Sequence, residues 1–252
     1  MFVKIGTKEC KTPNITLMGN VSNVDSPMKF VKSKSFTVLA DVEDNCQTSD
    51  RVKLDWFLSN KAGEFFGKLI RVGKRDSPRL DIKERSLDYG VYFLKIEATM
   101  KNQRIRNYAF GFFEIVPSNL IAKITSGNKI FWGVNKTVTF NAFDSFDPDI
   151  LPSTTEGLRF QWFCRREGER SPQDFSSFPV LIIDKNKKDV GGCYGNGPRR
   201  INSTSGTASL NASLLELGVT YVVELQVMKD NRVARTAHTF KVTKPKLYIQ
   251  IR

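Results

Sequence analysis

A pattern of short alternating segments, repeated once along the chain, constrains the fold more than any other feature. Each copy places a tryptophan inside such a segment, in DWFL around Trp56 and in QWFC around Trp162. Each copy later places a tyrosine just after a glycine, in LDYGVY ending at Tyr92 and in LELGVTY, where the tyrosine is Tyr221. Period-two alternation indicates half-buried β-strands, whereas helical periodicity is hard to find in either copy. The sequence therefore predicts an internal repeat of about a hundred residues built from strands.

The repeated aromatic residues have a defined place in a two-sheet sandwich. A tryptophan at the centre of the third strand fills the space between the sheets, and a tyrosine after an L-x-x-G turn forms a tyrosine corner. In that corner the ring is buried and the hydroxyl bonds the backbone upstream. Gly90 and Gly218 stand where the turn needs a positive φ. We expect an all-β fold with two tandem immunoglobulin-like or fibronectin type III-like β-sandwiches. The expected core anchors are Trp56, Tyr92, Trp162 and Tyr221.

The repeat also sets the expected domain boundaries. Residues 1–117 form the first sandwich, residues 118–245 the second, and residues 246–252 read as the first strand of a following repeat. The spacing from tryptophan to tyrosine is 36 residues in the first copy and 59 in the second. The additional length lies in an insertion at residues 165–209. Because binding sites concentrate in loops held by a rigid scaffold, this insertion is where we expect a binding site.

Four cysteines fall two in each half of the chain, which predicts one disulfide per half. The preferred pairs are Cys10–Cys46 and Cys164–Cys193, because each closes a loop within its own half. Sequence alone allows three connectivities and does not choose among them. The second bridge would pin the insertion to the strand that carries the second tryptophan. Free buried thiols are the alternative, while a zinc site lacks the paired C-x-x-C spacing it needs.

Glycosylation signals favour a secretory route. The pattern N-x-[S/T] occurs five times. Together with the evenly divided cysteines it indicates an oxidising, extracellular compartment. No run approaches the roughly eighteen apolar residues of a membrane helix, and the first ten residues contain no apolar signal core, so an extracellular chain of this kind is expected to be part of a longer protein. The candidate glycosylation sites are Asn14, Asn20, Asn135, Asn202 and Asn211.

The net charge of +13 would attract anionic partners but does not specify a fold. The excess is spread over both halves, +6 before Pro117 and +7 after it. No basic stretch is interleaved with aromatic residues as in a base-stacking groove, so no nucleic-acid partner is expected. A solvated basic surface is the simplest interpretation. The candidate contacts to a polyanion, a sulfated glycan or an anionic lipid, are the arginine pairs of the insertion, Arg165, Arg166, Arg199 and Arg200.

Motifs of catalysis are missing from the sequence. The single histidine, His238, excludes motifs that need two, such as the H-E-x-x-H zinc helix. There is no G-x-S-x-G elbow or P-loop, and GGCYGNG does not fit a dinucleotide fingerprint. We expect no enzymatic activity, no catalytic residue and no cofactor. The acidic turn offers Asp144, Asp147 and Asp149 as weak calcium candidates, but aspartates that cap a turn around Pro148 are the favoured interpretation.

Two segments of the second copy, FNAFDSFDPD and GLRFQWFC, resemble the signature of polycystic-kidney-disease-type (PKD) and receptor-for-egg-jelly (REJ) modules. In that signature a strand, a D-x-S-x-D-P-D turn and a central Trp followed by Cys recur. The preceding VPSNLIAKITSGNKIFWGVNKTVTF is similar to the corresponding segment of polycystin-1 relatives. Over about residues 5–245 the chain is identified as a member of the polycystin-1 family, REJ region. The first copy departs from the signature, because Leu58 stands where the cysteine would follow its tryptophan and the DPD turn is missing.

The resemblance implies a function that composition does not. Members of this family are large membrane receptors whose extracellular repeats precede an autoproteolytic segment and a multipass membrane region. They associate with polycystin-2-type calcium-permeable cation channels, often in cilia or sperm. By this resemblance the chain is an extracellular module, on the outer side of the plasma or ciliary membrane, that acts in adhesion and in ligand or mechanical sensing. Its implied partners are a polycystin-2-type channel subunit, reached through a membrane part that this chain lacks, and an extracellular protein or glycan ligand. A polyanion-binding module is the alternative function.

Overall fold

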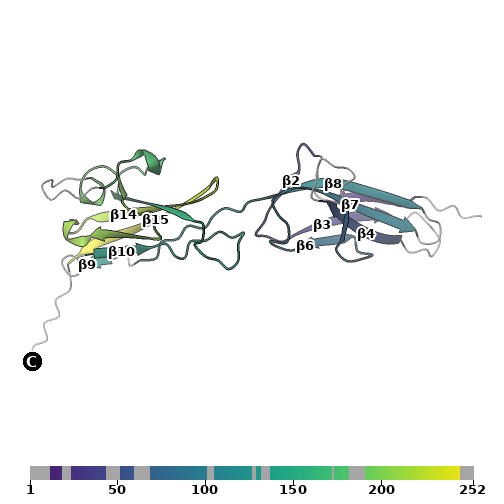
Figure 1. Cartoon of the computed structure of the whole chain (residues 1–252), viewed down its shortest axis with the longest axis horizontal. Helices are drawn as coiled ribbons and strands as arrows, with labels where there is room; N and C mark the ends of the chain where they lie inside the picture. The colour runs from purple at the N-terminus through teal and green to yellow at the C-terminus, as the bar shows by residue number, and fades with distance from the viewer. Residues whose placement is uncertain are drawn as a thin grey trace, which may run out of the picture. The chain divides into compact units, whose positions relative to one another are not determined.

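The structure is a computed structural model of the chain. It describes residues 12–18, 24–43, 52–59, 69–100, 105–126, 129–131, 137–171, 173–181 and 191–244. Within these ranges the regular elements are β-strands and three-residue 3₁₀ helices, which confirms the predicted all-β class. The chain separates into two compact units, Met1–Ser118 and Asn119–Arg252 (Figure 1). The expected start of a following repeat, residues 246–252, lies outside the described residues.

The first unit is a sandwich of a three-stranded and a five-stranded sheet. The chain crosses between the two sheets at most of its connections, as in the Greek-key sandwiches of immunoglobulin-like domains, and successive described strands stay in one sheet only twice, both times in the larger sheet. All neighbours are antiparallel except β2 and β8, which run parallel. The smaller sheet has the order β1 (Asn14–Met18), β3 (Phe36–Glu43), β6 (Arg79–Ile82). The larger sheet has the order β2 (Met28–Val31), β8 (Arg106–Val116), β7 (Gly90–Met100), β4 (Val52–Ser59), β5 (Ile70–Val72).

Side-chain alternation places the core of this unit between its two sheets. On β7, Tyr92, Leu94 and Ile96 face inward and are buried as their alternation predicts, and Phe93 is buried on the opposite side. The smaller sheet adds Val38 and Leu80 from the opposite side. Burial of one such large apolar side chain contributes roughly 1.5–3 kcal/mol. The alternating sequence therefore forms strands because each strand has one face to bury.

The second unit repeats this plan with a two-stranded and a five-stranded sheet. Its Trp-bearing strand pairs with β14 as β4 pairs with β7 in the first unit, and its outermost pair, β15 and β9, is again parallel. The smaller sheet is β10 (Thr137–Asn141) with β13 (Thr207–Asn211). The larger has the order β12 (Arg199–Ile201), β11 (Arg159–Arg166), β14 (Thr220–Lys229), β15 (Arg232–Thr243), β9 (Lys129–Phe131). Three short 3₁₀ helices lie outside the sheets: η1 (Phe175–Ser177), η2 (Gly192–Tyr194) and η3 (Ala212–Leu214).

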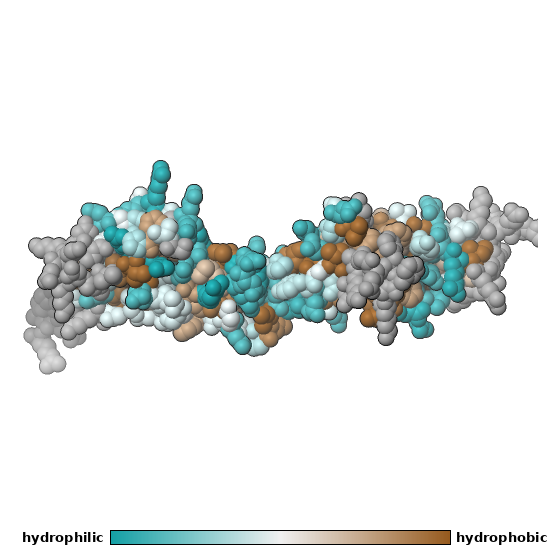
Figure 2. Space-filling model, turned by 45° about the horizontal axis from the view of Figure 1, so that its top comes forward, coloured by the Kyte–Doolittle hydropathy of each residue, from teal (hydrophilic) through white to brown (hydrophobic). Residues whose placement is uncertain are grey.

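Hydrophobic residues also reach the surface of each unit among hydrophilic ones (Figure 2). In the first unit they include Tyr108 and Phe110 on β8, and in the second Phe143 and Leu151 in the loop after β10. Over the described part of the chain, no helix has the length and apolar character needed to cross a bilayer.

Candidate functional site

The two tryptophans occupy equivalent, fully buried positions. Trp56 lies on β4 and Trp162 on β11, and neither side chain exposes any surface. Each indole Nε1 donates a hydrogen bond of 2.9 Å to a backbone carbonyl, that of Ser77 in the first unit and that of Ser205 in the second. Because both indoles are enclosed and hydrogen-bonded, they are core residues that have no face for a ligand.

In each unit a tyrosine hydroxyl bonds the backbone of the preceding turn, as a donor in the first unit and as an acceptor in the second. The Tyr92 hydroxyl donates to the Asp88 carbonyl at 2.9 Å, and the Tyr221 hydroxyl accepts from the Glu216 amide at 2.8 Å. Burial raises the pKa of both phenols, so both stay protonated at neutral pH. The glycine of each turn has a positive φ, 134° in the first copy and 81° in the second. The sequence places these two corners where the structure has them.

A disulfide attaches the insertion to the second unit. Cys164 at the end of β11 and Cys193 in η2 are joined, with Cα atoms 5.4 Å apart and both side chains fully buried. This is the pair that the sequence analysis preferred. The neighbouring Tyr194 enters the same core, where its hydroxyl accepts a hydrogen bond from the Asn211 amide. The other expected pair, Cys10 and Cys46, lies outside the described residues.

Two carboxylates fix the insertion further. Glu224 on β14 accepts a hydrogen bond of 2.6 Å from the Arg165 Nε and another from the Ser171 hydroxyl. Glu169 accepts from the Gly197 amide at 2.9 Å, and so links the two arms of the insertion. These charge-assisted bonds are stronger than neutral ones, so they hold the described parts of the insertion against the unit.

An aromatic cluster seals the outer face of the larger sheet in the second unit. Phe163, on the side of β11 that faces away from the core, packs against Phe175 of η1 and against Phe178, with ring centres 5.1 Å and 5.3 Å apart. The Arg235 guanidinium lies 4.8 Å from the centre of the Phe175 ring. Phe163 and Phe175 expose no surface. The insertion is therefore a cover for this sheet, which strand alternation alone did not predict.

This arrangement removes much of the cationic surface expected of the insertion. Arg165 binds Glu224, and Arg166 binds Glu216. Arg199 and Arg200 are half-buried on β12. Two of the four candidate polyanion contacts are thus neutralised by carboxylates, and the other two expose only part of their side chains.

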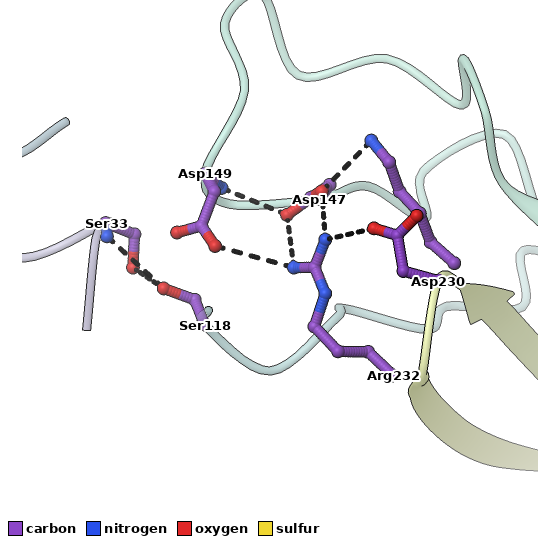
Figure 3. A network of polar contacts seen from close by, with 7 residues as sticks. Ser33, Ser118, Asp147, Asp149, Asp230 and Arg232 are labelled. Atoms are coloured by element: carbon purple, nitrogen blue, oxygen red, sulfur yellow. Dashed lines mark hydrogen bonds and ion pairs between the residues drawn. The ribbon is translucent and has the colours of Figure 1, made fainter. Parts of the chain in front are cut away.

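The acidic turn of the second unit is a salt-bridge network (Figure 3). Asp147 is buried, and the two terminal nitrogens of Arg232 bind its two oxygens at 2.9 Å and 2.7 Å. Lys229 Nζ lies 3.1 Å from one of the same oxygens. The backbone amide of Asp149 donates to Asp147 at 3.1 Å, which is the turn cap that the sequence favoured. Burial raises the pKa of Asp147, but the hydrogen bonds from Arg232, from the Asp149 amide and from Lys229 outweigh burial and lower the pKa to about 2.

The calcium alternative does not fit this geometry. Arg232 and Lys229 occupy the side of Asp147 that a metal ion would need. Asp144 is exposed and accepts a hydrogen bond of 2.9 Å from the Thr125 hydroxyl. Among the described residues there is no group of three or more side chains able to hold a metal ion. Sequence reasoning missed the two cations, although the motif K-D-N-R at the β14–β15 hairpin turn carries both of them.

The glycosylation candidates differ in exposure. Asn14 on β1 and Asn202 after β12 are exposed. Asn211 is half-buried, and its side-chain oxygen caps η3 by accepting from the Ser213 amide at 3.0 Å. Asn20 and Asn135 lie outside the described residues.

Comparison with known proteins yields one family model and one relative of interest. A model described as REJ domain matches residues 40–250. Polycystin-1 of Homo sapiens is 22% identical over 156 residues, which are 62% of this chain and 3% of that protein. The chain therefore spans a very small part of this relative.

Among solved structures, the fibronectin(III)-like modules of Clostridium thermocellum CbhA are 13% identical, with 95% of this chain and 99% of that chain covered and a TM-score of 0.27. The N-terminal four Ig domains of Dscam1 isoform 8.4 are 13% identical, with 93% and 47% covered and a TM-score of 0.31.

Proposed function

The chain belongs to the REJ domain family and is similar to the REJ region of polycystin-1, and from this premise we propose that it is an extracellular module of a polycystin-1-like multipass membrane receptor. The family match carries this proposal, because it spans both sandwich units. The disulfide between Cys164 and Cys193 and the exposed sequons at Asn14 and Asn202 support an extracellular location. The proposed role is structural and sensory, and it involves no enzymatic step.

The extracellular location has a direct test. We expect the chain, expressed with a secretion signal in mammalian cells, to lose mass when an N-glycanase is added and to show linked cysteines under non-reducing conditions. Asn202→Gln should remove one glycan, whereas Asn196→Gln, which lies in no sequon, should remove none. Secreted chain with four alkylatable thiols and no glycan would contradict the proposal.

We further propose that the units carry mechanical load in the receptor. In the first unit β2 and β8, the second and the last of its described strands, run parallel and are paired from Met28 with Phe113 to Val31 with Val116. Force applied at the two ends pulls such strands in opposite directions along their length, so their hydrogen bonds are loaded together in shear. The pair β9 and β15 repeats this arrangement in the second unit. These two pairs are the structural support for a role in force sensing.

Single-molecule stretching tests this role. The Lys32 amide donates to the Val116 carbonyl at 3.0 Å and extends the β2–β8 pair. Lys32→Pro removes that donor, and we expect the unfolding force of the first unit to fall. Lys32→Ala is the matched control, because it loses the ion pair with Asp88 but keeps the amide. An equal unfolding force in both variants and the parent chain would contradict load-bearing by this pair.

The proposed partner of the whole receptor is a polycystin-2-type channel, and the proposed activity is ligand or force sensing and adhesion. The test is co-expression of the channel with a receptor in which residues 1–252 are replaced by a flexible linker of equal length. We expect surface delivery to be retained and force-evoked current to be lost. Force-evoked current that survives the replacement would exclude this region from sensing.

A further inference from the structure

The outer face of the larger sheet in the first unit carries a row of aromatic and cationic side chains. Strand register aligns Arg71 on β5, Phe57 on β4, Lys95 on β7 and Phe110 on β8 directly across the sheet. Tyr108 stands two residues before Phe110 on the same face, and the centres of these two rings are 6.4 Å apart. Lys95 Nζ lies 4.9 Å from the Tyr108 ring centre and 5.8 Å from that of Phe57. We call these five side chains the aromatic face.

Two rings of the aromatic face reach solvent, whereas Phe93 and Phe112, next to them on the same side of the sheet, are buried. Tyr108 exposes 57% of its surface and Phe110 50%. Exposed aromatic side chains that adjoin on one flat sheet are typical of interaction surfaces rather than of solvated strands. Their rigid rings gain contact area at low entropic cost, so they are effective anchors for a partner.

The second unit shows what covers the equivalent face. The row at the same register there consists of Arg200, Phe163, Glu224 and Ala237. Phe175 of the insertion packs on Phe163, and both rings are fully buried. The Ser171 hydroxyl donates to Glu224. In this chain, then, a polypeptide segment with an aromatic side chain fills the face, and its polar groups match the charge of the central residue.

The aromatic face has a positive residue at the register position where the second unit has a negative one, and further cations stand on its rim. Lys95 stands where the second unit has Glu224, but its Nζ binds Glu97 at 2.9 Å, so the cations left to attract a partner are those on the rim. In two ion pairs on the rim, the cation is more exposed than the carboxylate. The side chains of Arg106 and Lys29 are 69% and 67% exposed, whereas their partners Glu97 and Glu114 are 21% and 30% exposed. The face therefore presents positive charge around its rings, which complements an acidic partner.

We propose that the aromatic face docks an acidic polypeptide segment that carries an aromatic side chain. The ring of the partner packs on Phe57 and Phe110, in the way that Phe175 packs on Phe163 in the second unit. Carboxylates of the partner bind the outward-facing cations on the rim. This inference does not depend on the identity of the receptor, because it rests on the two faces of this one chain.

Selection of displayed random peptides against the whole 252-residue chain tests the proposal. We expect enrichment of sequences with Phe, Tyr or Trp beside Asp or Glu. The double variant Tyr108→Ser with Phe110→Ser should weaken binding of the selected peptides about tenfold or more, since buried aromatic anchors carry most of the energy of such contacts. Val233→Ser, at a residue 55% exposed on β15, is the matched control and should leave binding unchanged.

A charge-swap variant distinguishes charge-complementary binding from non-specific hydrophobic binding. Lys29→Glu with Arg106→Glu should shift the selected sequences from acidic to basic, while Arg79→Glu on the smaller sheet should not. Both target side chains are largely exposed, and an unchanged thermal unfolding curve confirms that the variants fold. The proposal would be overturned if the charge-swap variant selected the same acidic peptides as the parent chain. It would also be overturned if peptides still bound the variant that lacks both rings. Ring-dependent retention of a heparin or neutral-glycan probe without any peptide enrichment would assign the face to sugar and overturn it as well.

Discussion

Substitution of Asp147 by asparagine removes the charge at the centre of the salt-bridge network and keeps the shape of the side chain. The amide oxygen of Asn can still accept the bond from the Asp149 amide, so the turn cap is retained. Arg232 and Lys229, whose side chains are 15% and 16% exposed, lose their shared anionic partner. Complete loss of the partner of a buried ion pair costs about 3–5 kcal/mol. Arg232 keeps longer contacts with Asp149 at 3.4 Å and Asp230 at 3.6 Å, so the expected loss lies at the lower end of that range. We therefore expect Asp147→Asn to destabilise the second unit by several kcal/mol at neutral pH.

The pH dependence of this loss can be worked from the pKa of Asp147. Its folded-state pKa is lowered from 3.8 to about 2, and this shift corresponds to about 2.5 kcal/mol of stability. The pKa is depressed in the folded state, so this contribution is fully present above pH 4 and is lost as the pH falls through 2. The difference in unfolding free energy between the parent chain and Asp147→Asn should therefore shrink by about 2 kcal/mol between pH 6 and pH 2, because the folded-state carboxyl is half protonated at pH 2.

Urea unfolding at several pH values, read by pulsed hydrogen exchange and mass spectrometry, measures this difference. Peptides from β14 and β15 assign the transition to the second unit. Asp144→Asn is the matched control, because this exposed carboxylate lies in the same turn and should change stability by at most about 0.5 kcal/mol. A difference between parent and Asp147→Asn that stays constant as the solution is acidified would refute the reasoning, since the loss would then come from packing rather than charge.

Three further substitutions test the scaffold around the insertion. Tyr221→Phe removes the corner hydroxyl and should cost about 1 kcal/mol in urea unfolding, whereas Tyr108→Phe at an exposed ring should cost nothing measurable. Replacement of both Cys164 and Cys193 by alanine should destabilise the second unit by about 3 kcal/mol, and an unchanged urea midpoint would contradict a structural role for the bridge. Arg165→Gln should lower the stability of the second unit, because Glu224 loses its cationic partner. It should not change the salt concentration at which the chain elutes from heparin. Elution at lower salt would show that the insertion does bind polyanions.

The inner faces of both sandwiches could be predicted from the sequence because packing leaves few alternatives. A strand that alternates apolar and polar residues has one way to bury its apolar side, so Trp56 and Trp162 lead directly to the core. The L-x-x-G turn fixes the corners in the same way, since the tyrosine hydroxyl must find a backbone partner once its ring is buried. These features depend on local pattern and short separations.

The rest depends on contacts between residues far apart in the chain. Arg232 lies 85 residues from Asp147, and no local pattern links a hairpin turn to an acidic loop that precedes it by four strands. The aspartates therefore left calcium as a weak alternative to turn capping, although the cations that bind Asp147 and Asp149 are part of the same unit. Phe163 shows the same problem, because alternation assigns it to the solvent side of β11 and only the folded insertion reveals that Phe175 covers it.

The two units share their inner-face contacts but carry different residues on the outer faces of their larger sheets. Their inner faces keep the same indole hydrogen bond and the same tyrosine corner, because any substitution there leaves a cavity or an unpaired polar group. The outer faces carry no such constraint, so Glu224 and Ala237 in one unit correspond to Lys95 and Phe110 in the other. In the second unit the insertion cannot be removed without exposing Phe163, which now has no exposed surface. In the first unit Tyr108 and Phe110 are each about half exposed, so a partner can contact both rings directly.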